Sequence, residues 1–177
     1  MRIIAGRWRG HTIAAPPGTR TRPTTDRVRE AWMSAVQLDL PDARVLDLFA
    51  GSGALGLEAL SRGARHATFV EKASGPLRAL LANVHKLHAD DAVEVIRGDA
   101  LKFVAGLESG AFDIAFADPP YGTGEAEGLA ELFRERQFAQ QLWIEHRAGE
   151  PMPVLPGAHT RKYGDTALTF IPAPEPV

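Results

Sequence analysis

The sequence contains no cysteine and no long apolar run. The lack of cysteine excludes disulfide bonds, thiolate zinc sites, iron–sulfur clusters and cysteine nucleophiles, and it is typical of proteins in a reducing compartment. No stretch reaches the roughly 18 consecutive apolar residues that a transmembrane helix needs. Residues 1–7 also lack the apolar segment of a signal peptide. We therefore expect a soluble, cytoplasmic protein that does not enter a membrane.

With 177 residues, of which 45% are hydrophobic and 24% charged, the chain has the size and composition of one globular domain. Its formal net charge of −2 conceals an uneven distribution. Residues 1–30 carry seven arginines against two acidic residues, a balance of +5, whereas the remaining 147 residues have a balance of −7. A charged N-terminus can simply be solvated, but arginine is the cation that best fits phosphate and guanine. These charges favour a short polyanion-binding arm on an acidic body.

The hydrophobic pattern predicts an α/β protein with a mostly parallel sheet. Two short strands, at 2–5 and 11–15, are expected before a basic linker and a first helix over 25–38. From there strands alternate with helices, which favours a parallel sheet covered on both faces. The strands are expected at 44–49, 67–71, 93–96, 112–117 and 142–145, and the helices at 54–62, 74–87 and 125–136. The turn Gly164-Asp165 then predicts a hairpin of 160–163 with 166–170, an antiparallel pair at the sheet edge.

A glycine loop with nearby acidic residues predicts a nucleoside site. The pattern Gly51-x-Gly53-x-x-Gly56 follows a strand and opens a helix, and Glu71 comes where an acidic residue binds ribose hydroxyls. Asp47 precedes the loop, where a carboxylate suits a cationic sulfonium or ammonium group better than a pyrophosphate. Asp99 follows the third strand and could accept a hydrogen bond from an adenine amino group. Each acidic residue alone could be an ordinary cap, but together they follow three successive strands at one sheet edge.

The tetrapeptide Asp118-Pro119-Pro120-Tyr121 predicts a site for an exocyclic amine. Two prolines fix φ and remove two backbone donors, so the carboxylate and the proline carbonyl offer acceptors only. Such acceptors can hold both hydrogens of an amine, while the tyrosine ring provides a face for a flipped-out base. The structural alternative is a rigid turn at the end of a strand.

These motifs resemble a known family. The loop at 47–53 together with Asp118-Pro119-Pro120-Tyr121 resembles class I S-adenosylmethionine-dependent amino-methyltransferases. Segments 2–6, 8–10, 22–30 and 51–62 are similar to bacterial RsmD-type enzymes, which methylate the 2-amino group of one guanine in small-subunit (16S) ribosomal RNA. The resemblance implies a Rossmann-like fold with a seven-stranded, mostly parallel sheet, an antiparallel C-terminal edge hairpin and a small N-terminal β-hairpin extension. It also implies an RNA-binding arm over 1–24 and a methyltransferase domain over 25–177.

Residue roles follow from the same resemblance. The residues implied to bind S-adenosylmethionine are Asp47, Phe49, Ala50, Gly51, Gly53, Glu71, Asp99, Ala100 and Asp118. The residues implied to hold the guanine amine and base are Asp118, Pro119, Pro120 and Tyr121. The arginines implied to contact RNA are Arg2, Arg7, Arg9, Arg20, Arg22 and Arg27.

Other interpretations remain open from the sequence. A DNA adenine amino-methyltransferase would share the tetrapeptide, an NAD-dependent oxidoreductase would share the glycine loop, and a non-catalytic RNA-binding module would share the fold. No metal is expected, because a sulfonium methyl is already electrophilic and His85-x-x-His88 has no obvious third ligand. The acidic body favours a narrow RNA footprint or one completed by ribosomal proteins. The size of the chain favours a monomer.

Overall fold

The structure is a computed structural model that describes residues 1–16 and 23–175. Its helices are α1 (Pro23–Val36), α2 (Ala54–Ser61), α3 (Ser74–Lys86), the short 3₁₀ helix η1 (Asp90–Ala92), α4 (Ala100–Ala105) and α5 (Glu125–Arg136). Its strands are β1 (Arg44–Leu48), β2 (His66–Glu71), β3 (Val93–Arg97), β4 (Phe112–Ala117), β5 (Ala139–Arg147), β6 (His159–Tyr163) and β7 (Thr166–Pro172). Within the described part of the chain, no helix is long and apolar enough to cross a membrane.

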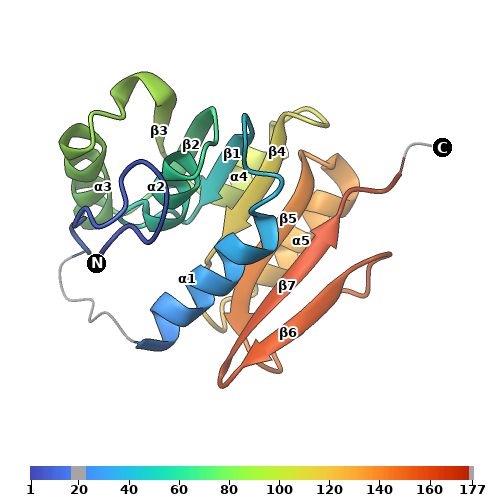
Figure 1. The fold of residues 1–177 in the computed structure, drawn as a ribbon. Coiled ribbons are helices and arrows are strands. Elements are labelled where there is room, and N and C mark those ends of the chain that lie inside the picture. The colour runs from blue at the N-terminus through green and yellow to red at the C-terminus, as the bar shows by residue number, and fades with distance from the viewer. Residues whose placement is uncertain (17–22, 176–177) are drawn as a thin grey trace.

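The seven strands form one sheet in the order β3-β2-β1-β4-β5-β7-β6 (Figure 1). Strands β1 to β5 pair with one another in parallel, whereas β7 is antiparallel to both β5 and β6. The predicted mostly parallel sheet with an antiparallel C-terminal hairpin is therefore confirmed. Because parallel strands end at the same edge, the loops after β1 to β4 meet there, which is where α/β folds bind ligands.

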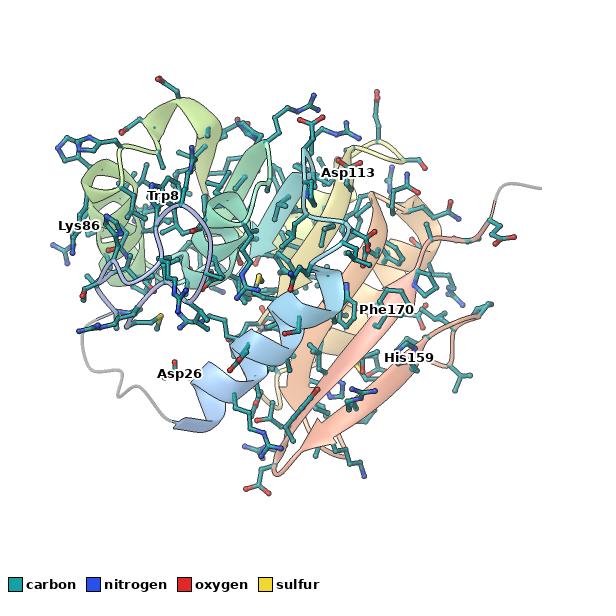
Figure 2. The ribbon with its side chains drawn as sticks, in the orientation of Figure 1. Trp8, Asp26, Lys86, Asp113, His159 and Phe170 are labelled. Carbon is teal, nitrogen blue, oxygen red and sulfur yellow. The ribbon has the colours of Figure 1, made fainter. Side chains whose placement is uncertain are left out.

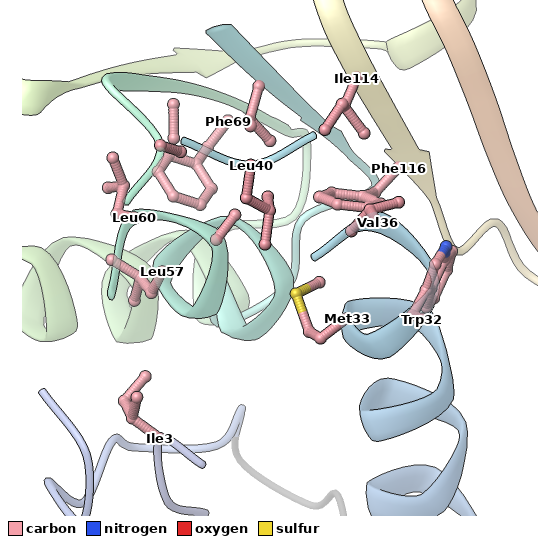
Figure 3. Close-up of a cluster of buried hydrophobic side chains, with 14 of the residues drawn as sticks. Ile3, Trp32, Met33, Val36, Leu40, Leu57, Leu60, Phe69, Ile114 and Phe116 are labelled. Carbon is pink, nitrogen blue, oxygen red and sulfur yellow. The ribbon is translucent and has the colours of Figure 1, made fainter. Parts of the chain in front are cut away.

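Helices cover both faces of the sheet and enclose two hydrophobic cores. One core lies under α4 and α5, and the other lies under α1, α2, α3 and the N-terminal segment. In the second core, Trp32 of α1 meets Phe116 of β4 edge-to-face, with ring centroids 5.8 Å apart. Figure 3 shows Met33 of α1 lying toward α2, with Leu57 on the side of α2 that is turned away from α1. Burial of this apolar surface on both faces is the main stabilising contribution to the fold.

The N-terminal segment, residues 1–16, reverses direction but does not form the two predicted strands. Its only described β-pairing is an isolated bridge between Arg2 and Thr12. Backbone hydrogen bonds join its two arms, from the Ile3 amide to the His11 carbonyl at 3.0 Å and from the Ile13 amide to the Met1 carbonyl at 2.8 Å. Between these bonds, Glu58 of α2 accepts from the amides of Ile4 and Ala5, at 2.8 and 3.2 Å, so the pairing does not extend into a ladder. The segments 2–5 and 11–15 therefore do not form the regular strands predicted for them, although they lie antiparallel and are hydrogen-bonded to each other.

Two further elements differ from the prediction. Helix α4 was not predicted, because its six residues, five of them apolar, are too few to show a helical period. Strand β5 is longer at both ends than the predicted 142–145. Its extension toward the C-terminus continues the strand beyond Glu145 to Arg147 at the sheet edge.

Candidate active site

The sequence-predicted cofactor residues lie at the carboxyl edge of the parallel strands. Asp47 lies in β1, and 49–53 form the loop that leads into α2. Glu71 ends β2, Asp99 follows β3 and precedes α4, and Asp118 follows β4 directly. The structure thus brings together at one edge residues that are up to 71 positions apart in the sequence. This arrangement matches the place where open α/β sheets bind nucleoside ligands.

Glu71 fixes the glycine loop. One of its carboxyl oxygens accepts from the amide of Gly51 at 3.1 Å, and the other accepts from the amides of Lys72 and Ala73, at 2.7 and 3.2 Å. The loop needs glycine at Gly53, where φ is +84° and a Cβ would lie 2.3 Å from the Leu80 side chain. The loop therefore approaches α3 closely and holds its backbone open toward the sheet edge.

Asp47 is buried beneath this loop, with 1% of its surface exposed. Its Oδ2 accepts from the amide of Gly56 at 2.9 Å. Burial raises its pKa well above the ordinary value, the Gly56 hydrogen bond lowers it, and the charges of Asp118 and Glu71 raise it further. Asp118 and Glu71 therefore both repel a negative charge on Asp47. A cationic ligand would relieve that repulsion.

Asp118 and Glu145 form a pair of neighbouring carboxyl groups. The parallel pairing of β4 with β5 sets Ala117 opposite Ile144, so the next residue on each strand lies at the same level. Protein atoms surround Asp118 closely although water still reaches its side chain, and this desolvation raises its pKa to about 6. Burial and the neighbouring Asp118 raise the pKa of half-buried Glu145 to about 8. At neutral pH the two groups share one proton, as close carboxyl pairs do.

Tyr121 is held in place by the same strands. Its hydroxyl lies 2.9 Å from Thr166 Oγ1 and donates a longer contact, 3.5 Å, to Glu145 Oε1. The guanidinium of Arg147 lies over its ring, 5.6 Å from the ring centroid. Burial raises the pKa of Tyr121 above its ordinary value, and the hydroxyl therefore stays neutral and available as a donor. These contacts fix the orientation of the ring.

Sequence reasoning did not identify Glu145 or Arg147 as site residues. The available signal was a charged residue directly after Leu142-Trp143-Ile144, at the carboxyl end of a strand. This signal could point to the site only once β5 was known to lie next to β4, which ends just before Asp118. Sequence reasoning did place Asp99 at this edge, and there its Oδ1 caps α4 by accepting from the amide of Lys102 at 3.0 Å.

The predicted RNA-binding arginines have different surroundings. Arg2, Arg9 and Arg27 are exposed, and Arg7 stacks on the Trp8 ring at 4.1 Å from its centroid. Arg20 and Arg22 lie outside the described residues.

Arg29, which was counted in the basic arm, is instead 94% buried. Its Nη2 donates to the Arg2 carbonyl at 2.9 Å and lies 3.6 Å from Asp26, the acidic residue near the start of α1 in Figure 2. Arg29 therefore joins α1 to the N-terminal segment rather than facing a polyanion.

The N-terminal segment is connected to the glycine loop through α3. Asn83 accepts from the amide of Ala14 at 2.7 Å and donates to its carbonyl at 2.9 Å, while also donating to the Ser52 carbonyl at 3.0 Å. Lys86, also on α3, donates to the carbonyl of Thr12 (Figure 2). The segment is thus a docked part of the molecule whose end lies beside the predicted cofactor loop. Among residues 1–16 and 23–175, no group of three or more side chains could hold a metal ion.

Residues 1–171 match the protein family described as Conserved hypothetical protein 95. The chain belongs to this family. A curated relative, ribosomal RNA small subunit methyltransferase D of Escherichia coli strain K12, is 37% identical over 159 residues, which cover 88% of this chain and 79% of the relative. The resemblance inferred from the motifs is therefore confirmed.

Solved structures agree with this family assignment. A hypothetical protein of Thermus thermophilus is 30% identical, with a TM-score of 0.80 over 98% of this chain and 99% of that one. An RNA methyltransferase from Salinibacter ruber, solved in complex with S-adenosyl-L-homocysteine, has a TM-score of 0.66 over 90% of this chain and 96% of its own. At 14% identity, that second likeness concerns the fold alone.

Proposed function

We propose that this chain is an S-adenosylmethionine-dependent methyltransferase that modifies the 2-amino group of a guanine in small-subunit ribosomal RNA. The observation that carries the proposal is the position of Asp118-Pro119-Pro120-Tyr121 at the end of β4, beside the acidic glycine loop of β1. The name of the 37% identical relative supports ribosomal RNA as the substrate. The nicotinamide interpretation leaves the arginines and the tetrapeptide unexplained, and the name of the relative does not support the DNA interpretation.

The residues at the sheet edge fit S-adenosylmethionine. Its sulfonium and ammonium groups are cations, and they would offset the repulsion that Asp118 and Glu71 exert on a charged Asp47. Each carboxylate has about four lone-pair sites, so Glu71 and Asp99 can bind ribose and adenine while they keep their backbone contacts. The loop at 49–53 and Ala100 complete the expected binding surface. When bound, the cofactor supplies an electrophilic methyl group.

The tetrapeptide would hold the guanine amine. The Asp118 carboxylate and the Pro119 carbonyl accept its two hydrogens, which directs the nitrogen lone pair away from them. As the nitrogen becomes positive, these acceptors bind it more strongly, and holding the reactants in line removes about 7–11 kcal/mol of barrier. Pro120 keeps the turn rigid, and the Tyr121 ring stacks on the base.

The arginine-rich N-terminus would bind the RNA backbone. The arm over 1–24, with Arg2, Arg7, Arg9, Arg20 and Arg22, together with Arg27 of α1, supplies cations that position a polyanion without reading its sequence. The acidic remainder of the chain limits this footprint, so ribosomal proteins would complete it on an assembling or assembled subunit. The enzyme would act as a monomer in the cytoplasm.

Methyl transfer to small ribosomal subunits tests the proposal. Tritium-labelled S-adenosylmethionine is offered with subunits from cells lacking this protein, and with free RNA and duplex DNA in parallel. Label in one N2-methylguanosine of the subunit RNA is expected. Label only in DNA adenine would show that the substrate is DNA rather than ribosomal RNA. No label, together with no binding of S-adenosylhomocysteine, would refute the proposal that the chain is a methyltransferase.

A substitution at Asp118 tests the role of the tetrapeptide. Asp118→Ala should lower the methyl-transfer rate about 10²–10³-fold, because one acceptor of the developing charge is removed. Binding of S-adenosylhomocysteine should persist, since the loop at 49–53 is unchanged. Asp91→Ala, an exposed position before β3, is the matched control and should keep full activity. Full turnover by Asp118→Ala would contradict the assignment.

A further inference from the structure

Glu145 lies between the two ends of the Asp118-Pro119-Pro120-Tyr121 turn. On one side it meets the Asp118 carboxyl, with which it shares a hydrogen bond. On the other side its Oε1 lies 3.5 Å from the Tyr121 hydroxyl. It comes from β5, which pairs directly with β4, so a sheet strand rather than a loop positions it. No role for this residue follows from the proposed function.

We propose that Glu145 is a positioning residue for methyl transfer: in its protonated form it donates to the Asp118 carboxylate and orients it toward the guanine amine. This inference rests on the proposed function for its substrate. Its unprotonated oxygen at the same time accepts from Tyr121, so one side chain fixes both the amine acceptor and the stacking ring. A carboxylic acid can do this because it contains one donor and one acceptor, which a carboxylate or an alkyl group does not.

The surroundings of the pair favour a proton on Glu145 rather than on Asp118. Burial and the Asp118 charge both raise the Glu145 pKa, whereas the hydrogen bond from Glu145 lowers that of Asp118. Glu145 is therefore the carboxyl that keeps the proton at neutral pH, and Asp118 is the one that stays ionised. Asp118 remains open to water, as an acceptor for an incoming amine must be.

The elements that neighbour the Asp118–Glu145 pair contribute both charged and uncharged side chains. Asp47 of β1 interacts with Asp118 by charge repulsion, and Arg147 of β5 lies over the Tyr121 ring. Strand β7 places Leu168 and Thr166 on this side, and β6 adds Arg161 opposite Leu168. Helix α1 crosses the same face of the sheet (Figure 1), and its Asp26 and Arg29 pair with each other at 3.6 Å rather than with Asp118 or Glu145.

The test compares the pH dependence of single-turnover methyl transfer in the wild type, Glu145→Gln and Glu145→Ala. In the wild type the rate should rise as Asp118 ionises near pH 6 and fall as Glu145 ionises near pH 8. Glu145→Gln keeps a donor and an acceptor but cannot ionise, so the rise should stay and the fall should disappear. Glu145→Ala should lose on the order of 10²-fold at neutral pH, the cost of a misplaced reacting group.

Two controls separate positioning from a merely structural role. Glu135→Gln, at an exposed position on α5, should reproduce the wild-type profile. All variants should bind S-adenosylhomocysteine as the wild type does, because Glu145 lies outside the loop at 49–53. Ionisation of the RNA affects every protein equally and cancels in the comparison. An unchanged fall near pH 8 in Glu145→Gln, or a wild-type rate in Glu145→Ala, would overturn the inference.

A second measurement needs no methyl acceptor. Carboxyl carbons of the free protein are followed by NMR as the pH is varied, with Asp118→Asn used to assign the signals. In the wild type, Asp118 and Glu145 should titrate in two linked steps, and in Glu145→Gln Asp118 should titrate in one. Independent single titrations in the wild type would refute the pairing. A wild type that pairs its carboxyls but methylates no guanine would instead refute the proposed function.

Discussion

Gly6 should be required for docking of the N-terminal segment onto α2, and Gly10 should not. Both residues have positive φ, +88° and +82°, so alanine at either position has a similar backbone cost of about 1–2 kcal/mol. The two positions differ in the room that they leave for a Cβ atom. A Cβ at Gly6 would lie 1.9 Å from the Ser61 carbonyl oxygen, whereas a Cβ at Gly10 meets nothing within 4 Å. Gly10→Ala is therefore a matched control for Gly6→Ala.

The extra cost at Gly6 can be worked out from the contacts that must separate. Ser61 accepts from the amides of Arg7 and Trp8, at 2.9 and 3.0 Å, and its hydroxyl donates to the Ala5 carbonyl at 2.6 Å. At about 1 kcal/mol net for each hydrogen bond, their loss costs about 3 kcal/mol. Gly6→Ala should therefore destabilise the protein by about 3 kcal/mol more than Gly10→Ala.

Urea unfolding and amide hydrogen exchange measure this difference. If the segment detaches before the rest unfolds, the midpoint moves less than expected, but the amides of Ile4 and Trp8 exchange faster in Gly6→Ala. Gly10→Ala should leave both amides protected. The reasoning is refuted if the two variants have the same unfolding free energy within about 1 kcal/mol, the worth of one hydrogen bond, and the same exchange rates.

Two further predictions concern the region around the glycine loop. Asn83→Ala removes three hydrogen bonds to Ala14 and Ser52 and should lower the free energy of unfolding by about 2–4 kcal/mol, measured by thermal unfolding. Calorimetry should also show weaker binding of S-adenosylhomocysteine. Wild-type values in both measurements would contradict the connection between the N-terminal segment and the glycine loop. Asp47→Asn should raise the melting temperature at pH 7, because the folded-state pKa of Asp47 is raised and its charged form therefore destabilises the fold. That gain should fade below pH ~4, where the unfolded-state carboxyl is also protonated, and binding of S-adenosylmethionine should weaken; a lower melting temperature at pH 7 would count against the buried charge.

Local patterns in the sequence determined most of the architecture. Alternating strands and helices predict a parallel sheet, and the Gly164-Asp165 turn predicts the edge hairpin, because both depend on period and turn chemistry within a few residues. The glycine loop, the acidic residues after successive strands and the Asp118-Pro119-Pro120-Tyr121 turn also predict a site at the sheet edge. That inference needed only the rule that parallel strands end on the same side.

The tertiary structure alone decided which polar groups meet. Glu145 lies beside Asp118, 27 positions earlier in the sequence, because β5 is next to β4 in the sheet. The N-terminal segment was predicted as two paired strands from its own residues, yet the amides of Ile4 and Trp8 donate to Glu58 and Ser61 of α2. The hydrophobic periodicity of a sequence indicates which face of a helix or strand is apolar, but it does not identify the partner of a polar side chain. That partner depends on strand order and packing, which bring distant residues within hydrogen-bonding distance.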